Sequence, residues 1–168
     1  MKKTKTQIIK RSSTLFLKFV IILISMGVLA CMIWFPQTEG RAINLDLVSI
    51  YTDPFIIYIY IASIPFFVAL YQSFILLGYI DKNKVFSQFS VNAVRNIKYC
   101  AMALMGFIAA AILYIFLMAK TTNDDGAGAI AIGLVTIFAS SVIATATAVF
   151  QKLLQNAVDI KSENDLSV

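Results

Sequence analysis

Apolar side chains are concentrated in four long runs, at about residues 15–35, 55–80, 99–119 and 127–150. A helix rises about 1.5 Å per residue, so each run is long enough, as a helix, to cross the hydrocarbon core of a bilayer. Little chain remains outside the runs. The pattern predicts an all-α fold, a polytopic membrane protein whose residues 1–168 form a single transmembrane domain of four helices.

Start and turn signals agree with this division of the chain. Asp53 followed by Pro54 predicts a helix start, because an aspartate caps free N–H groups and proline is tolerated at the first helical position. The turn residues 123–126 are too few to fold independently, so the last two spans are expected to be antiparallel neighbours. Pro65 lies inside the second run and is expected to free a carbonyl there.

The composition leaves no room for a separate soluble domain. Apolar residues make up 60% of the chain and charged residues 14%, against about 45–50% and 25% in an average soluble domain. The net charge of +5 could indicate nucleic acid as a partner. Its distribution instead favours the lipid bilayer, and no direct contact with nucleic acid is expected.

The basic residues predict the orientation. All but two of the 14 lysines and arginines fall in the arm 1–14, the first turn of span one, the connection 81–98 or the tail 151–168. The two exceptions are Arg41 and Lys120. Positive residues mark cytoplasmic segments, so both termini are predicted to lie inside, in a bacterial inner (cytoplasmic) membrane.

The first run has an alternative interpretation as a targeting signal. Residues 27–31 loosely fit a lipoprotein cleavage box that would leave Cys31 as a lipidated N-terminus. The apolar run, however, continues through Trp34 and Phe35, where a lipoprotein would have a polar tether. We therefore expect a retained helix with an outer aromatic belt.

The connection 81–98 is patterned. Phe86, Phe89 (or Ala93), Val94 and Ile97 recur at steps of three to four, which predicts a short amphipathic cytoplasmic helix between spans two and three, capped by Ser87 or Ser90. Its apolar face could lie in the acyl boundary, with Arg95 and Lys98 at lipid headgroups, or could dock a partner. The candidate partner-binding residues are Phe86, Phe89, Arg95 and Lys98, together with Glu163, Asn164, Asp165 and Leu166 of the tail.

The fourth run carries a stripe of small and hydroxylated residues. Gly133, Ser140 and Ala144 are its candidate helix-packing positions, because small residues allow backbones to approach closely in lipid. Gly106, Ala109 and Ala110 offer a counterpart on span three. Such a stripe could instead line a pore, and packing could also occur between chains in a homo-oligomer.

The residues that carry chemistry are scarce. The chain has no histidine, and no acidic residue lies deep in a predicted span. Lys18, one turn into span one, is expected to snorkel to the inner surface. Cys31 and Cys100 lie at opposite ends of their spans and cannot share a disulfide or a metal. We therefore expect no catalytic residues, no metal and no cofactor, and a protein that is not an enzyme.

Several short motifs resemble a known family. They are residues 84–87, residues 94–97 and residues 163–168, within the four-span layout. Together they look like the bacterial family of small membrane proteins called domain of unknown function 2975, over nearly the whole chain. The genes of members often neighbour one for a small helix-turn-helix regulator, so the resemblance implies a membrane protein that binds or restrains a DNA-binding protein.

Two hypotheses about function follow. The first is a non-enzymatic regulatory or scaffold protein that tethers a cytoplasmic partner, such as a helix-turn-helix transcription regulator, through the connection and the tail. The second is a small transporter, channel or immunity-type protein, suggested by the polar stripe and Pro65. The absence of a charge at membrane depth favours the first hypothesis.

Overall fold

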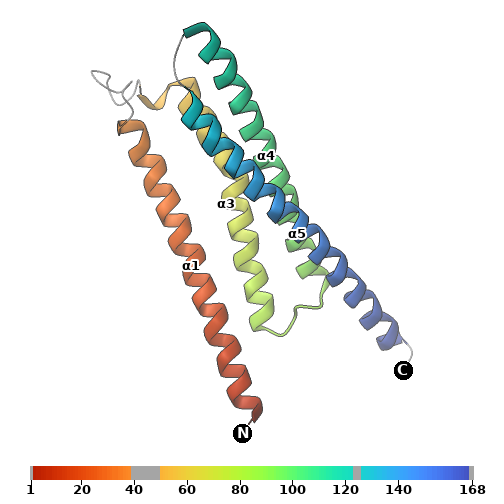
Figure 1. The fold of residues 1–168 in the computed structure, drawn as a ribbon. Helices are drawn as coiled ribbons and strands as arrows, with labels where there is room; N and C mark the ends of the chain where they lie inside the picture. The colour runs from red at the N-terminus through yellow and green to blue at the C-terminus, as the bar shows by residue number, and fades with distance from the viewer. Residues whose placement is uncertain (1, 39–49, 123–125, 167–168) are drawn as a thin grey trace.

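A computed structural model describes residues 2–38, 50–122 and 126–166, with side chains described for 12–36, 50–119 and 126–164. The described residues form four long helices: α1 (Lys2–Thr38), α3 (Pro54–Asp81), α4 (Gln88–Thr122) and α5 (Ala127–Leu166) (Figure 1). Each predicted apolar run lies within one of these helices.

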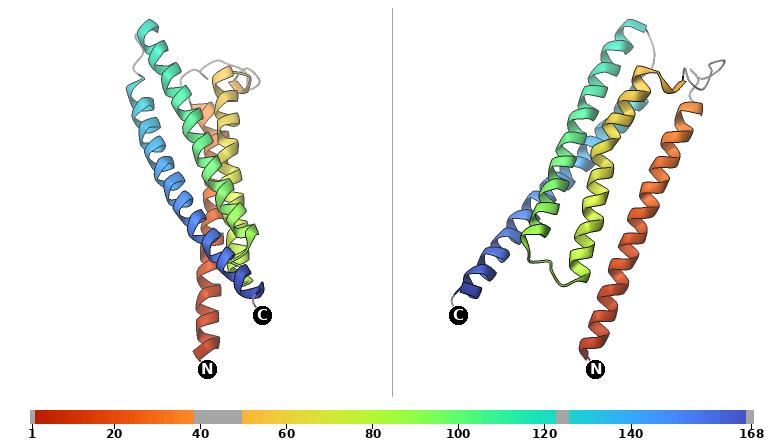
Figure 2. Two further views of the ribbon diagram at one scale, coloured as in Figure 1. Left: turned by 90° about the vertical axis from the view of Figure 1, so that its right-hand side faces the viewer. Right: turned by 180° about the vertical axis from the view of Figure 1, so that it is seen from behind.

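The helices pack in chain order. The main contacts join α1 to α3, α3 to α4, and α4 to α5. In Figures 1 and 2, α5 crosses α4 obliquely and does not return to α1. The start of α1 and the end of α5 lie at the same end of the bundle, together with the short connection 82–87 (Figure 2). We call this the N/C end, and the other the opposite end.

Local signals explain where α3 begins and ends. The carboxylate of Asp53 accepts a hydrogen bond from the N–H of Phe55 at 2.7 Å, and Pro54 is the first helical residue, as the sequence predicts. At the other end Asn83 adopts a left-handed φ of 55°. The N–H of Lys84 bonds to the carbonyl of Tyr79, and that of Asn83 to Ile80. This is the Schellman pattern that satisfies the last carbonyls of a helix.

In the described part of the chain, four helices are long and apolar enough to cross a membrane: Ser12–Pro36, Pro54–Asp81, Gln88–Ala119 and Ala127–Asn164. The protein is therefore a multi-pass membrane protein. The helices run well beyond the apolar runs themselves: α5 alone has 40 residues, or about 60 Å, twice the thickness of the hydrocarbon core.

The separate amphipathic helix expected over the connection is not seen. Its residues from Gln88 onward are the first turns of α4, which continues without a break into the predicted span. No glycine or proline lies between Gln88 and Gly106 to interrupt the helical hydrogen bonds. The non-helical connection is thus reduced to residues 82–87, and residues 151–166 of the expected tail belong to α5.

The best-buried part of the molecule lies at the N/C end. Val91 and Val94 of α4 contact Leu154 of α5, and these three side chains are 1–3% exposed. Leu76, Val85 and Val158 pack around them. By contrast, the most apolar stretch of α1 has no buried residue. We call the six residues at the N/C end the N/C core.

Candidate functional site

The start of α4 is fixed by two serines. The Ser87 hydroxyl accepts a hydrogen bond from the N–H of Ser90 at 3.4 Å, so Ser87 caps the helix. The hydroxyls of Ser87 and Ser90 each donate to the carbonyl of Lys84, at 2.8 Å and 3.2 Å. Ser90 is fully buried. These bonds tie the connection to the first turn of α4.

The apolar face predicted for this segment is largely used inside the molecule. Ala93, Val94 and Ile97 are 3%, 1% and 8% exposed, and the face packs on α5. These three residues are therefore covered within the molecule, whereas Phe86 and Phe89, predicted on the same face, are exposed. Sequence periodicity found the correct face, but could not tell that another helix of the same chain covers it.

Two polar contacts reinforce this packing. The ammonium of Lys98 donates to the amide oxygen of Gln151 at 2.9 Å and lies 5.0 Å from the ring centroid of Tyr99. The amide of Gln88 donates to Gln155 at 3.3 Å, and Gln155 donates to Asp159. Lys98, a predicted partner-binding residue, is thus engaged between α4 and α5.

Three of the predicted partner-binding residues of this segment are exposed. Phe86 is 56% exposed and Phe89 is 69% exposed. The ring of Phe89 stacks on Tyr79 of α3, with centroids 6.2 Å apart. Arg95 is exposed on α4. Two aromatic rings, one in the connection and one in the first turn of α4, are thus exposed on this segment.

A groove joins the connection to the end of α5. It has a volume of about 400 Å³ and is lined by Phe86, Ala157, Ile160, Lys161 and Asn164. Ile160 is 60% exposed. The structure thus brings together Phe86 and Asn164, which the sequence analysis proposed separately. We call this the Phe86 groove.

The remaining predicted tail residues, Glu163, Asp165 and Leu166, lie at the end of α5. Glu163 is exposed on the last turns of α5. Asp165 and Leu166 belong to the helix backbone, but their side chains lie outside the described ones. Residues 167 and 168 also lie outside the described part of the chain.

The predicted packing positions of α5 face α4. Ser140 and Ala144 are 4% and 9% exposed. A Cβ added to Gly133 would lie 2.8 Å from the end of the Ile112 side chain, so glycine permits this close approach. The expected counterpart on α4 is wrong. Gly106, Ala109 and Ala110 are exposed, and the contact to Gly133 comes from Ile108 and Ile112, because large side chains fill the space that glycine leaves.

The hydroxyls of α5 give no support to a polar pathway. Thr136, Thr145 and Thr147 donate to carbonyls one turn earlier in their own helix. A groove of about 390 Å³ does open between α1 and α5 over α3 and α4, and it is lined mainly by apolar side chains. Its Tyr58 hydroxyl donates to the carbonyl of Phe107 at 2.5 Å. A polar solute would find few free partners there.

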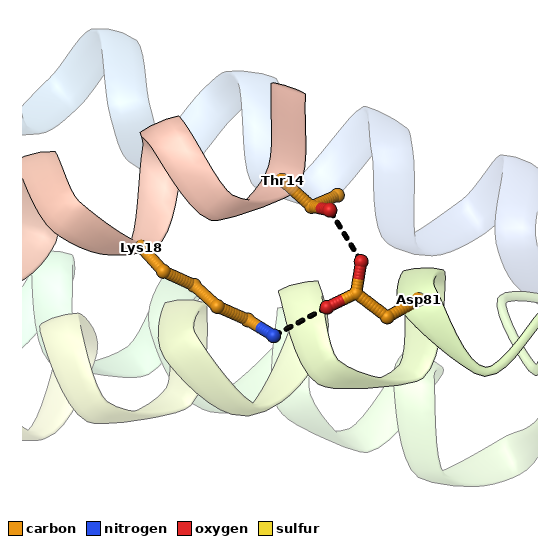
Figure 3. A network of polar contacts seen from close by, with 3 residues as sticks. All are labelled: Thr14, Lys18 and Asp81. Carbon is orange, nitrogen blue, oxygen red and sulfur yellow. Dashed lines mark hydrogen bonds and ion pairs between the residues drawn. The ribbon is translucent and has the colours of Figure 1, made fainter. Parts of the chain in front are cut away.

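An ion pair that the sequence analysis missed joins α1 to α3. The Lys18 ammonium pairs with one carboxylate oxygen of Asp81, and the Thr14 hydroxyl donates to the other (Figure 3). The side chains of Lys18 and Asp81 are 19% and 24% exposed. Lys18 also lies 5.6 Å from the ring centroid of Phe74. Lys18 was expected to snorkel toward the inner surface; its ammonium also has a counter-ion at the N/C end of the neighbouring helix.

Two further polar contacts hold α1 toward the opposite end, one from α3 and one from the residues that precede it. The Tyr60 hydroxyl donates to the carbonyl of Met32 at 2.9 Å, and the Tyr51 hydroxyl donates to that of Ile33 at 3.0 Å. In a regular helix the Met32 carbonyl would accept from the N–H of residue 36. That residue is Pro36, inside α1, which has no N–H. Tyr60 therefore satisfies a carbonyl that proline has freed.

The sequence of this chain is similar to that of a known family of membrane proteins. A family model described as "Protein of unknown function (DUF2975)" matches residues 16–168. The chain is also 51% identical over 160 residues to the uncharacterized membrane protein YoaS of Bacillus subtilis (strain 168). That alignment covers 94% of this chain and 99% of the relative. No solved structure matches. The resemblance inferred from short motifs is confirmed.

Proposed function

We propose that this chain, which belongs to the DUF2975 family of membrane proteins, is a non-enzymatic regulatory or scaffold protein. Its N/C end faces the cytoplasm of a bacterial cell and holds a cytoplasmic protein at the membrane. A helix-turn-helix DNA-binding regulator is the first candidate partner. Tethering would act by sequestering the partner or by raising its local concentration at the membrane.

The orientation is supported by the distribution of charge over the bundle. Lys82, Lys84 and Arg95 lie in or beside the connection at the N/C end, and Lys152 and Lys161 lie on the part of α5 that extends toward the same end. Positively charged residues flank spans on the cytoplasmic side. This supports a cytoplasmic N/C end with both termini inside.

The Phe86 groove is the observation that carries the proposal. It combines an exposed aromatic ring with the aliphatic Ile160 and the polar Lys161 and Asn164. Partner surfaces use such a combination: an apolar anchor is buried on binding, and polar groups at the rim fix its orientation. The groove lies between the connection and α5, and the N/C core, in which Val85 of the connection packs with residues of α4 and α5, holds the two together. A rigid surface loses little conformational entropy when a partner binds.

The test is a cross-linking pull-down of the full chain from native membranes. We expect the wild type to recover a small DNA-binding protein, and Phe86→Ala to lose it, because truncation removes the anchor of the groove. Truncation after Lys161 should lose it as well, because it removes Asn164. Membrane insertion should be unchanged in both variants.

Phe89→Ala is the matched control. It removes another exposed ring, three residues away, that does not line the groove. If recovery is lost with Phe89→Ala and kept with Phe86→Ala, the docking surface lies around Phe89 and Tyr79 and not at the Phe86 groove. If the wild type recovers only itself or other membrane proteins, the regulatory proposal is wrong.

A further inference from the structure

The Phe86 groove runs along one face of α5. The residues of α5 that line it are Ala157, Ile160, Lys161 and Asn164, which stand at positions i, i+3, i+4 and i+7 of the helix. Residues at these positions lie one above another on a helix surface. The groove is therefore parallel to α5 over about two turns, with Phe86 of the connection on its other side.

This groove lies beyond the lipid headgroups. Lys152 is the first charged residue of α5 and follows directly on its apolar run, so it marks the border of the hydrocarbon core. Lys161 comes nine residues later, which is about 13 Å along the helix, or about 10 Å along the membrane normal at a tilt of about 40°. The headgroup layer is only about 5–7 Å thick on each side. The exposed side chains of Phe86 and Ile160 are thus covered by neither acyl chains nor headgroups.

Lys161 gives the groove a positive charge that no nearby carboxylate offsets. Among the side chains that the structure describes, the only ion pair is the one between Lys18 and Asp81, and Lys161 is exposed. Asp159 and Glu163 each stand two positions from Lys161, which at about 100° per residue places them near the other side of α5. The groove therefore offers apolar walls and a cation at its rim, which an acidic group complements.

The shape of the groove favours a helix as its occupant. Addition of a strand needs an exposed sheet edge, and the described elements are all helices. A polyproline segment needs a groove lined with aromatic rings, and this one has Phe86 alone. A phosphorylated segment is held by clustered arginines, and none lines this groove. A groove that follows a helix over two turns, with apolar walls, is instead a surface on which an amphipathic helix packs.

We propose that the cytoplasmic partner places an amphipathic helix with an acidic rim in the Phe86 groove. Apolar side chains of that helix pack on Phe86 and Ile160, and a carboxylate one turn away pairs with Lys161. Side chains three or four residues apart lie on the same face of a helix, so a single helix makes both contacts. This assignment rests on the tethering function proposed above, to which it adds the chemistry of the surface that is bound.

The test is photo-cross-linking of the full chain in native membranes. Phe86 is replaced by p-benzoylphenylalanine, which keeps an aromatic ring in the groove and joins covalently to a group that packs against it. We expect a product with a cytoplasmic protein. Peptide mapping should place the cross-link in an amphipathic segment with Asp or Glu three or four residues from the joined side chain.

The charge at position 161 is then varied on the same background. Lys161→Glu should lower the yield of this product about fivefold, because an exposed attraction becomes a repulsion, and Lys161→Met about twofold, because only the attraction is lost. At about 1 M salt, where the Debye length is about 3 Å, the three yields should converge. Lys152→Glu is the matched control. It makes the same change of charge at an exposed lysine of α5 that does not line the groove, and it should leave the yield unchanged.

The outcomes separate this assignment from the tethering function. Yields that differ at low salt and converge at high salt, with Lys152→Glu at the wild-type level, support the acidic helix. Equal yields from all variants at low salt, or a cross-link with no Asp or Glu within one turn of it, would overturn the acidic helix and leave the tethering function standing. If position 86 of an inserted chain joins to lipid or to no cytoplasmic protein, tethering through this groove is wrong, and the acidic helix with it.

Discussion

The N/C core and helix α1 differ in how they are held together. In the N/C core, Val91, Val94 and Leu154 are almost completely buried among aliphatic neighbours. In the most apolar stretch of α1 no residue is buried, and large side chains such as Phe16, Phe19 and Trp34 are 62–70% exposed. Yet α1 makes four polar contacts with the segment 51–81, two near each end of its span.

We infer that this difference follows from the solvent on each part, with the N/C core at the border between lipid and water. Where a segment borders water, apolar side chains gain by leaving it, so a close-packed aliphatic core forms. Within lipid the surroundings are as apolar as the side chains, and burial gives no such gain. Polar groups have no partner in lipid, so there they hold one helix to another. The comparison predicts that different kinds of substitution will damage the two regions.

The largest effect is expected in the N/C core. Leu154→Ala removes a side chain that is 3% exposed and should lower the free energy of unfolding by about 2–5 kcal/mol, through lost burial and the cavity left behind. The measurement is reversible unfolding of the monomeric protein in mixed detergent micelles.

Leu153→Ala is the control for that experiment. It deletes the same atoms one residue earlier, from a side chain that is 61% exposed, and should change stability by no more than about 0.5 kcal/mol. Equal losses in the two variants would mean that the N/C core is no better packed than the surface, and the comparison would fail.

A smaller effect is expected at the ion pair between α1 and α3. Asp81→Asn leaves the Lys18 ammonium without its counter-charge. Because both side chains are only partly buried, we expect a loss of about 1–3 kcal/mol, the cost of leaving such a group without its partner. The effect should be local, with α1 separating from α3 while α4 and α5 stay packed. Distance measurements between spin labels on α1 and α3, and on α4 and α5, would resolve this.

The double variant Lys18→Met with Asp81→Leu sharpens the result. Replacing both members of a pair by apolar residues removes the unpaired charge, and such exchanges are often neutral. We therefore expect the double variant to keep α1 closer to α3 than Asp81→Asn does. If it behaves like the single variant, the pair contributes specific attraction that apolar contact cannot replace.

The sequence predicted the features that depend on neighbouring residues of the chain. Periodicity and length predicted four spanning helices, and Asp53 with Pro54 predicted the start of α3. The apolar face around Val94 was also recognised, but its neighbour was not. Whether lipid, a partner or α5 covers such a face depends on how helices are placed in space, which the periodicity of one segment does not contain.

The same limit explains the missed contacts of α1. Lys18 and Asp81 are 63 residues apart in sequence, and only the antiparallel packing of α1 on α3 brings them together. A signal existed, since each is a charged residue near the same border of its apolar run. Pro36 gave a signal too: a proline near the end of a spanning helix predicts a carbonyl that needs a donor. Neither signal identified the partner residue.

The smallest effect is expected at the Met32 carbonyl, which Pro36 leaves without its helical N–H donor. Tyr60→Phe removes only the hydroxyl that donates to the Met32 carbonyl. It should lower stability by about 0.6 kcal/mol, the mean for hydrogen bonds between helices in a bilayer. Tyr71→Phe is the control, because Tyr71 is a 63% exposed residue of the same helix and should show no loss.

Pro36→Ala decides why the Tyr60 bond exists. Alanine restores an N–H that can bond to the Met32 carbonyl within α1, so the hydroxyl of Tyr60 is no longer needed there. In a double-mutant cycle, Tyr60→Phe should then have less effect in the Pro36→Ala background than in the wild type. Equal effects in both backgrounds would show that Tyr60 holds α1 for a reason unrelated to proline. A reduced effect would mean that proline creates the acceptor by which α1, without a buried core of its own, is held to α3.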